Sequence, residues 1–231
     1  MQRQARLILF DLDGTLVNTG GAGLRAFDRA LAEEFGPGMN LNVVKPAGMT
    51  DPAIFYEIYL HNRGRMPDAD ESKRLFQSYL RFLREEIATS AGFRVLAGVE
   101  PLLERLDAIE ELHLGLGTGN LETGAKIKLE RANLNRFFPF GGFGSDSDDR
   151  DTVLSTAVER GRRRLPGGWE IETVFVVGDT PRDVASGKAI GARTLAVASG
   201  PYSRDELLTS GPDLATDDLL DGDSLVKWFL S

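Results

Sequence analysis

Four short apolar runs, separated by segments with helical spacing, constrain this sequence more than any other feature. The runs cover Leu7–Phe10, Leu112–Leu116, Val174–Val177 and Thr194–Ala198. A short continuous apolar run is typical of a strand that is buried on both faces of a parallel sheet. Helical patterns between the runs include Leu121–Ala132, Thr152–Arg160 and Pro181–Ile190. Strands that alternate with helices predict an α/β fold with a doubly wound, Rossmann-like parallel sheet.

Residues 20–90 interrupt this alternation. Apolar residues repeat there at helical spacing, first at Leu24, Phe27, Leu31 and Phe35 and later at Leu75, Tyr79, Phe82, Leu83 and Ile87. A further helix is expected around Ile54 and Ile58, and the segment has no convincing strand pattern. We therefore predict an all-helical cap, residues 18–94, inserted into an α/β core of residues 1–17 and 95–231. The glycine-containing segments Val17–Gly23 and Ala91–Gly98 are the expected hinges.

The composition excludes several classes of function. The 231 residues carry a net charge of −8, which argues against partners such as nucleic acid or an anionic membrane. The chain has no cysteine, so disulfides, thiolate metal sites and cysteine nucleophiles are excluded. No apolar run is long enough to span a membrane, and the first one ends at Asp11 and Asp13. We predict a cytoplasmic protein, either a monomer or a homodimer.

A pair of carboxylates directly follows the first apolar run, in the sequence Asp-Leu-Asp-Gly-Thr from Asp11 to Thr15. Ligands of open α/β sheets bind at the carboxyl ends of the strands, so Asp11 and Asp13 stand where reactive side chains are expected. A turn that merely closes a strand does not need two carboxylates at this spacing. The motif therefore predicts chemistry rather than a structural turn.

A second acidic pair follows the apolar run Val174–Val177, in the sequence Gly-Asp-Thr-Pro-Arg-Asp from Gly178 to Asp183. Pro181 suits the first turn of a helix, which puts Asp179 at the strand end and Asp183 in that first turn. Acidic residues at a helix start are common for dipole reasons alone. Together with Asp11 and Asp13, however, they predict four carboxylates at one sheet edge, where mutual repulsion requires a cation. Oxygen ligands of this type select Mg²⁺.

The third motif is Thr118-Gly119-Asn120, after the run Leu112–Leu116. A hydroxyl and free backbone N–H groups at a strand-to-helix turn can hold an anion. The same tripeptide can also begin a helix without any further function. Alone the tripeptide is therefore a weak signal, and as a functional site it would hold an anion.

In their order and in the position of the helical insertion, the three motifs resemble the haloacid dehalogenase superfamily, in particular its phosphoglycolate phosphatase-like branch. The resemblance covers nearly the whole chain and implies a phosphoric monoester hydrolase with Mg²⁺ as cofactor. It implies that Asp11 is the nucleophile that forms an aspartyl phosphate and that Asp13 is the general acid and base. It also implies that the metal is held by the Asp11 carboxylate, the Asp13 backbone carbonyl and Asp179, with Asp183 helping directly or through water. The phosphoryl oxygens are then bound by Thr118 and the nearby backbone amides of Gly119 and Asn120.

One element departs from the pattern of this family, which usually has a lysine after the third strand. The corresponding stretch, residues 144–151, has no lysine, and Arg150 occupies that place ahead of a helix. The guanidinium fork suits phosphate. Lys126 and Lys128, on the preceding helix, are alternatives. We expect Arg150 to pair with the nucleophile and both lysines to lie on solvated helix surface.

The sequence predicts a phosphatase for a small phosphorylated metabolite and does not identify the substrate. A phosphomutase of the same fold and a non-catalytic phosphate-binding module are the alternatives. Specificity is expected from the cap, with Arg25, Lys45, Thr50 and Asp51 as candidate contacts.

Overall fold

The computed structural model describes residues 3–231, so residues 1 and 2 of the expected core lie outside the described part. A six-stranded sheet forms the centre of these residues, in the order β5-β4-β1-β6-β7-β8, and all its pairings are parallel. Its strands are β1 (Arg3–Phe10), β4 (Leu112–Thr118), β5 (Gly141–Phe143), β6 (Trp169–Gly178), β7 (Arg193–Val197) and β8 (Leu214–Thr216). The fold class predicted from the apolar runs is confirmed.

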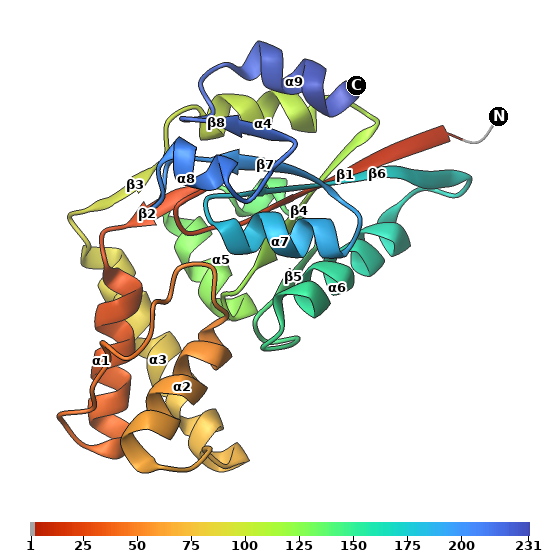
Figure 1. Ribbon diagram of the computed structural model, residues 1–231. Helices are drawn as coiled ribbons and strands as arrows, with labels where there is room; N and C mark the ends of the chain where they lie inside the picture. The colour runs from red at the N-terminus through yellow and green to blue at the C-terminus, as the bar shows by residue number, and fades with distance from the viewer. Residues whose placement is uncertain (1–2) are drawn as a thin grey trace.

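Helices cover both faces of this sheet (Figure 1). Ile8 and Phe10 of β1 pack with one set of helices, and Leu7 and Leu9 pack with the other. The first set comprises α4 (Val99–Asp107), α5 (Glu122–Arg131) and α9 (Gly222–Leu230), and the other face carries α6 (Arg150–Arg164), α7 (Pro181–Ala189) and the short α8 (Arg204–Leu208). Alternate residues of β1 therefore enter two separate hydrophobic cores, as expected for a strand buried on both faces.

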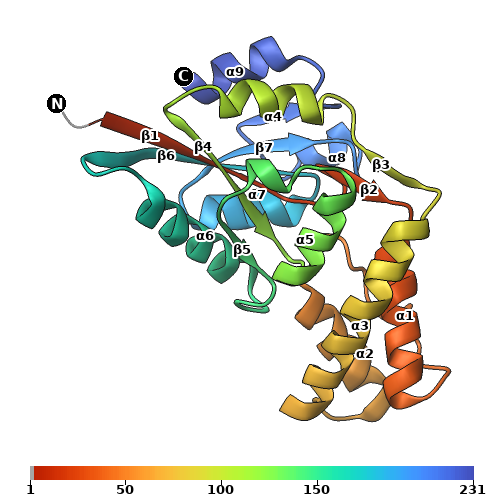
Figure 2. The same cartoon turned by 180° about the vertical axis from the view of Figure 1, so that it is seen from behind.

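Three helices form a separate bundle beside the sheet, at the lower edge of Figures 1 and 2. They are α1 (Ala22–Phe35), α2 (Asp51–Arg63) and α3 (Ala69–Thr89). The bundle has its own hydrophobic core, in which Phe27 of α1, Phe55 of α2 and Tyr79 of α3 are buried. These helices lie where the sequence predicted an inserted helical cap. We keep that name for them, while the domain boundaries at residues 17/18 and 94/95 stay a prediction.

Two short antiparallel strands join the cap to the core. β2 (Val17–Thr19) pairs with β3 (Phe93–Val95), so that Val17 lies opposite Val95 and Thr19 opposite Phe93. These strands lie within the two expected hinge segments, and each is only three residues long. That the segments act as hinges stays a prediction. Within residues 3–231, no helix is both long and apolar enough to cross a membrane.

Candidate active site

The carboxyl ends of three neighbouring strands bring the sequence motifs together. β1 lies between β4 and β6, so Asp11 follows the central strand, Thr118 ends one neighbour and Asp179 follows the other. The chain adds β4 and β5 on one side of β1 and then β6, β7 and β8 on the other, so the strand order reverses between β1 and β6. Such a switch point is where ligands of α/β sheets bind. The predicted convergence of the motifs is therefore present in the structure.

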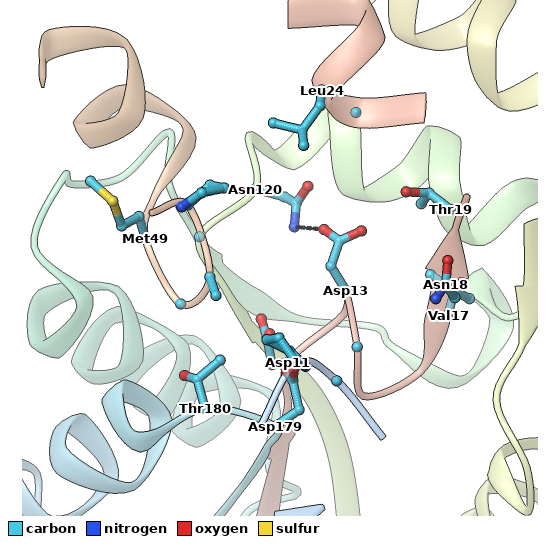
Figure 3. Close-up of a pocket in the computed structure, with 18 of the residues that line it drawn as sticks. Asp11, Asp13, Val17, Asn18, Thr19, Leu24, Met49, Asn120, Asp179 and Thr180 are labelled. Carbon is cyan, nitrogen blue, oxygen red and sulfur yellow. Dashed lines mark hydrogen bonds between the residues drawn. The ribbon is translucent and has the colours of Figure 1, made fainter. Parts of the chain in front are cut away.

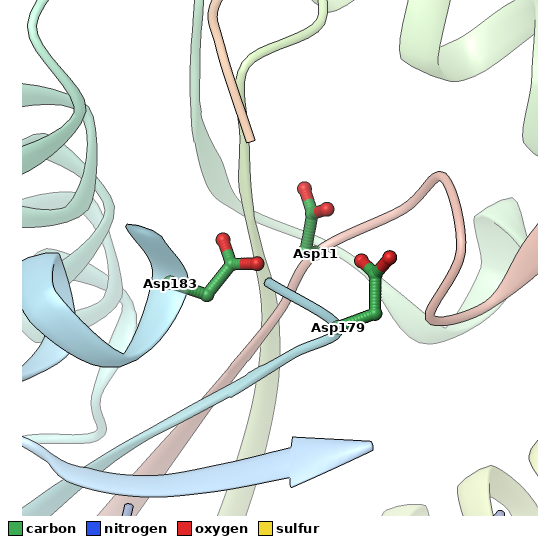
Figure 4. A group of neighbouring side chains, drawn as sticks. All are labelled: Asp11, Asp179 and Asp183. Atoms are coloured by element: carbon green, nitrogen blue, oxygen red, sulfur yellow. The ribbon is translucent and has the colours of Figure 1, made fainter. Parts of the chain in front are cut away.

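Three carboxylates form a buried cluster at this edge (Figure 4). One oxygen each from Asp11, Asp179 and Asp183 lies within 4.8 Å of the others, a spacing that fits a shared metal ion. Burial raises the pKa of Asp179 to about 9, and the charges of Asp183 and Asp11 add to this increase. Burial likewise raises the pKa of Asp11 to about 6, against the opposing effect of Arg150. The negative charges of Asp11 and Asp179 are thus incompletely balanced by the protein alone, and a cation bound among the carboxylates would stabilise their ionised forms.

Asp179 is held by close backbone packing as well as by a hydrogen bond. Thr15 Oγ1 donates to Asp179 Oδ1 at 3.2 Å. Gly14 has a φ of +83°, and a Cβ on it would lie 2.2 Å from Asp179 Oδ2. Position 14 of the Asp-Leu-Asp-Gly-Thr motif therefore requires glycine for two reasons: its backbone is left-handed, and a side chain there would collide with the Asp179 carboxylate.

Arg150 is the buried cation of the carboxylate cluster. It is the first residue of α6, and its Nη2 lies 2.9 Å from Asp11 Oδ1 and 2.5 Å from Asp183 Oδ1. Burial alone lowers the pKa of Arg150, but Asp11 and Asp183 outweigh that effect and raise it. Its Nε is buried and has no hydrogen-bond partner within residues 3–231. The structure therefore places Arg150 beside Asp11, as the sequence predicted, with one donor free.

Lys128 is a second buried cation, and here the sequence-based expectation was wrong. Instead of lying on solvated surface, its Nζ donates to Asp13 Oδ2 at 2.6 Å and also to Asn120 Oδ1. The Lys128 side chain is only 4% exposed, because α5 turns this face toward the core. Lys126, in contrast, is exposed and pairs with Glu122, as expected for a surface lysine.

The Thr118–Asn120 turn contacts Lys128 and Asp13 through the side chain of Asn120. Asn120 Nδ2 donates to Asp13 Oδ2 at 2.9 Å and to Thr118 Oγ1 at 2.9 Å. Thr118 is completely buried, whereas Gly119 and Asn120 line the adjoining cavity. Asn120 thus connects Thr118 with the acidic side chain of Asp13.

A loop of the cap, residues 46–51, docks directly on the core motifs. The Asp51 N–H donates to the Gly119 carbonyl at 2.8 Å, and the Leu121 N–H donates to Asp51 Oδ2 at 2.9 Å. A Cβ on Gly119 would lie 2.2 Å from the Met49 carbonyl oxygen, so only glycine permits this approach. Thr50 Oγ1 donates to the Asp148 carbonyl at 3.0 Å. The cap therefore closes over the carboxylate cluster in this structure.

A cavity of about 590 Å³ lies between the cap and the core (Figure 3). Its core side includes Asp11, Asp13, Asn120, Lys128, Arg150 and Asp179. Of the four expected contacts on the cap side, Asp51 lines the cavity, whereas Arg25, Lys45 and Thr50 are not among its lining residues. Arg25 instead bonds Glu86 at 2.7 Å, which holds its guanidinium on the cap surface.

The family profile for haloacid dehalogenase-like hydrolases matches residues 8–197. The chain belongs to this family. The match includes all three motifs at the sheet edge and the whole helical cap. The resemblance predicted from the motifs is therefore confirmed.

Several phosphatases are similar to this haloacid dehalogenase-like hydrolase over most of its length. A phosphoglycolate phosphatase of Rhodospirillum rubrum is 28% identical, and the alignment covers 96% of this chain and 90% of the relative. One from Synechococcus elongatus is also 28% identical, with coverage of 89% and 90%. The expected enzyme class, a phosphoric monoester hydrolase, agrees with these relatives.

Solved structures show the same fold. A hydrolase from Pseudomonas syringae superposes with a TM-score of 0.70 at 23% identity, over 97% of this chain and 99% of that one. A haloacid dehalogenase-like family protein from Streptococcus pneumoniae gives a TM-score of 0.64 at 19% identity, over 98% of both chains.

Sequence reasoning missed some lining residues of this hydrolase. Ser199 and Gly200 follow β7 and line the cavity, and Ser199 Oγ donates to the Gly14 carbonyl at 2.7 Å. Their place after an apolar run, at the same edge as the acidic motifs, was the available signal. Tyr79 of the cap also lines the cavity, and its helical spacing indicated only a core residue.

Proposed function

We propose that this chain is a Mg²⁺-dependent phosphatase that hydrolyses a small phosphomonoester through an aspartyl phosphate on Asp11. The observation that carries the proposal is the joint placement of Asp11 and Asp13 in one cavity with Asp179 and two buried cations. The family membership and the phosphatases among the relatives support the reaction class.

The residues present fit a magnesium ion. We assign Asp11, Asp179 and the backbone carbonyl of Asp13 as its protein ligands, because carboxylate and carbonyl oxygens are what Mg²⁺ prefers. Asp183 fits better as a partner through water, since Arg150 and Thr180 already donate to its two carboxylate oxygens. The ion, when bound, offsets the negative charge of the phosphoryl group and the nucleophile.

The first step forms a bond from Asp11 Oδ to phosphorus and breaks the bond from phosphorus to the ester oxygen. Two anions must approach each other here, so positive charge is needed beside both. Arg150 supplies part of it from 2.9 Å, and its free Nε can donate to a phosphoryl oxygen. The N–H groups of the turn before α5 are further candidate donors; that of Asn120 donates weakly to Thr118 Oγ1 here, at 3.4 Å.

Asp13 handles the proton in both steps. In the first step it gives a proton to the leaving alcohol oxygen, and in the second it takes one from the water that attacks phosphorus. Lys128 and Asn120 both donate to its Oδ2, which fixes the carboxylate and leaves Oδ1 for substrate and water. The Asp13 side chain is 42% exposed, so it is accessible from the cavity. Hydrolysis of the acyl phosphate then restores Asp11.

The docked cap limits the access of bulk water to the cavity in this scheme. The Asp51–Gly119 and Asp51–Leu121 hydrogen bonds link the cap loop to the phosphoryl-binding turn. We propose that the β2–β3 connection acts as the hinge that opens the cap for substrate entry and product release.

Purified protein incubated with p-nitrophenyl phosphate and Mg²⁺ tests the proposal. We expect phosphate release that stops with a chelator and returns with added Mg²⁺, and an Asp11→Asn variant without activity. Rapid quenching followed by intact-mass measurement is expected to show one phosphoryl group on the wild type. Absence of turnover would favour a phosphate-binding module. Isomerised sugar phosphate without released phosphate would favour a phosphomutase.

A further inference from the structure

The cavity extends beyond the space that a phosphoryl group needs, and the cap lines that extension. A volume of about 590 Å³ lies within the range of cavities that hold drug-sized organic ligands. Its cap wall carries the apolar side chains Leu24 and Phe27 of α1, Met49 of the docking loop, Ile54 of α2 and Tyr79 of α3. In Figure 3, Leu24 lies across Asp13 from Asp11 and Asp179, which is the side where a leaving alcohol would lie.

This wall holds apolar surface that is open to the cavity. Leu24 is 56% exposed, although Phe27, one turn further along the same helix, is buried in the core of the cap. Transfer of such apolar surface out of water is favourable and scales with the area covered. A ligand with an apolar body therefore gains affinity here, whereas a small polar alcohol leaves the wall in contact with water.

Around Asp13 and on the helical wall, the charges of the lining do not favour an anionic alcohol. Lys128 and Arg150 are already paired with Asp13 and with Asp11 and Asp183. Tyr79 stays neutral, because burial and the charges of Asp51 and Asp13 raise the pKa of its phenol well above its ordinary value. Asp51 adds a carboxyl group to the cap wall.

Arg94 of β3 is the one cation of the lining without a counter-ion. Within residues 3–231 it forms no ion pair, and it lies in the β2–β3 connection rather than on the helical wall. If the alcohol carried a carboxylate, as phosphoglycolate does, Arg94 would be its natural partner. The apolar wall thus favours a substrate with an uncharged organic body, whereas Arg94 favours one that carries a carboxylate.

We propose that the preferred substrate is a phosphomonoester of an uncharged alcohol with an extended alkyl or aryl body, which packs on the wall formed by Leu24, Met49 and Ile54. This inference rests on the proposed phosphatase activity and adds its substrate class. The phosphoryl group lies at Asp11, and the organic body extends past Asp13 toward α1 and α2.

A homologous series tests the proposal. Ethyl, butyl and hexyl phosphate have leaving alcohols of nearly equal acidity, so differences in kcat/KM report contacts of the organic body. We expect kcat/KM to rise about threefold to fourfold per methylene, hence roughly 100-fold from ethyl to hexyl. 2-Phosphoglycolate and glucose 6-phosphate are expected to fall below hexyl phosphate. A flat series, or either polar ester above hexyl phosphate, overturns the proposal.

A charge-introducing variant sharpens the test. Leu24→Arg is expected to lower kcat/KM for hexyl phosphate at least 10-fold and to raise the ratio of 2-phosphoglycolate to hexyl phosphate. Leu60→Arg is the matched control, because Leu60 is a 46% exposed leucine on α2 that does not line the cavity. Equal effects of the two variants contradict a role of Leu24 in substrate contact. Arg94→Gln tests the alternative of an anionic alcohol: if the wild type prefers 2-phosphoglycolate to hexyl phosphate and Arg94→Gln abolishes that preference, the substrate class proposed here is wrong.

Binding of alkylphosphonates separates this inference from the reaction itself. Ethyl-, butyl- and hexylphosphonate resist hydrolysis, and their Kd values can be measured by calorimetry with the wild type and Mg²⁺. We expect Kd to fall with chain length. If p-nitrophenyl phosphate and all alkyl phosphates are inert while this trend holds, the proposed activity fails and the ligand class stands. If turnover is present and Kd is independent of length, the ligand class fails and the activity stands.

Discussion

The Nζ atom of Lys128 lies 2.6 Å from Oδ2 of Asp13, although 115 positions separate the two residues in the sequence. Asn120 completes the arrangement, since its side chain accepts from Lys128 and donates to Asp13. The general acid and base that we propose is therefore anchored by a buried lysine of α5. This anchor explains how a carboxylate that is partly open to the cavity keeps one orientation.

We expect Lys128→Met to lower kcat about 100-fold, because loss of the anchor releases Asp13 from its position toward the leaving oxygen. KM is expected to change much less, and the pH profile of kcat is expected to shift, which a purely structural role would not cause. Lys128→Arg is expected to recover part of the activity. Lys126→Met, a change of an exposed lysine on the same helix, is the control. Wild-type kcat in Lys128→Met would remove this role, provided that both variants have unchanged melting temperatures.

Asp11→Asn is expected to abolish turnover and to leave the fold intact. The change is isosteric and removes the nucleophilic carboxylate, while Arg150 keeps its contact with Asp183 at 2.5 Å. Single-turnover assays measure the residual rate, and circular dichroism checks the fold. A variant that retains even a tenth of wild-type kcat contradicts covalent catalysis by Asp11.

Magnesium is expected to stabilise the protein as well as to activate it. A ligand at 100 times its Kd adds about 2.7 kcal/mol to the free energy of unfolding, which corresponds to a rise in Tm of roughly 5–10 °C for a chain of this size. Asp179→Asn is expected to remove most of that rise, because Asp179 belongs to the carboxylate cluster. Asp70→Asn, on the exposed first turn of α3, changes the charge equally and serves as the control. Thermal melts with and without Mg²⁺ measure all three proteins, and an equal rise in all of them would place the ion elsewhere.

Asp51 gives the cap docking a defined pH dependence. Burial raises the pKa of Asp51 from 3.8 to about 6, with Lys128 and the Leu121 N–H opposing the increase. The carboxyl group of Asp51 therefore binds a proton more tightly in the folded protein than in the unfolded chain. The stabilising contribution of the protonated form is complete below pH 3.8 and is lost as the pH rises through 6, at a cost on the order of 3 kcal/mol.

Asp51→Asn is expected to escape this loss, since its amide oxygen can still accept from the Leu121 N–H without carrying a charge. The difference in Tm, variant minus wild type, is expected to grow more positive between pH 4 and pH 7. Calorimetric melts at fixed ionic strength measure it. A difference that stays constant over this range would show that Asp51 is not perturbed in the folded protein.

The fold and most of the site could be predicted from the sequence for a specific reason. β1, β4, β6 and β7 are central strands, so they read as continuous apolar runs, and their carboxyl ends must meet at one edge. The edge strand β8 has only three residues, too few for a pattern. The helix α9 was not predicted either, although its buried residues Leu225 and Phe229 lie one turn apart.

Lys128 shows where reasoning from a single residue type fails. A lysine in a helical segment is usually solvated, so its burial depends on a partner that lies far away in the sequence. The available signal was the phase of the helix: Leu121, Gly124 and Lys128 are spaced at i, i+3 and i+7, which places them on one face. Lys126 falls outside that phase and is exposed. The helix face that contains Leu121, Gly124 and Lys128, together with the acidic motif, therefore indicates Lys128 rather than Lys126 as the buried lysine.

Arg150 is the least expected residue of the site, because the resemblance drawn from the sequence implies a lysine at this position. Its Nη2 contacts both Asp11 and Asp183, and its Nε is buried without a partner within residues 3–231. One guanidinium can therefore hold the nucleophile, the helix α7 carboxylate and a phosphoryl oxygen at the same time. A lysine ammonium has no such fork and can replace only part of this arrangement.

We expect Arg150→Ala to lower kcat/KM about 10²-fold to 10³-fold, the usual effect of removing one donor that stabilises the transition state. Arg150→Lys is expected to recover much of the loss, because the charge returns beside Asp11 while the second contact does not. Lys126→Ala is the neutral control, since this side chain pairs only with the exposed Glu122. Steady-state kinetics with p-nitrophenyl phosphate measure all three variants, and melting temperatures identify any that are unfolded. If a folded Arg150→Ala variant keeps wild-type kcat/KM, Arg150 does not serve the phosphoryl group and only neutralises the buried carboxylates.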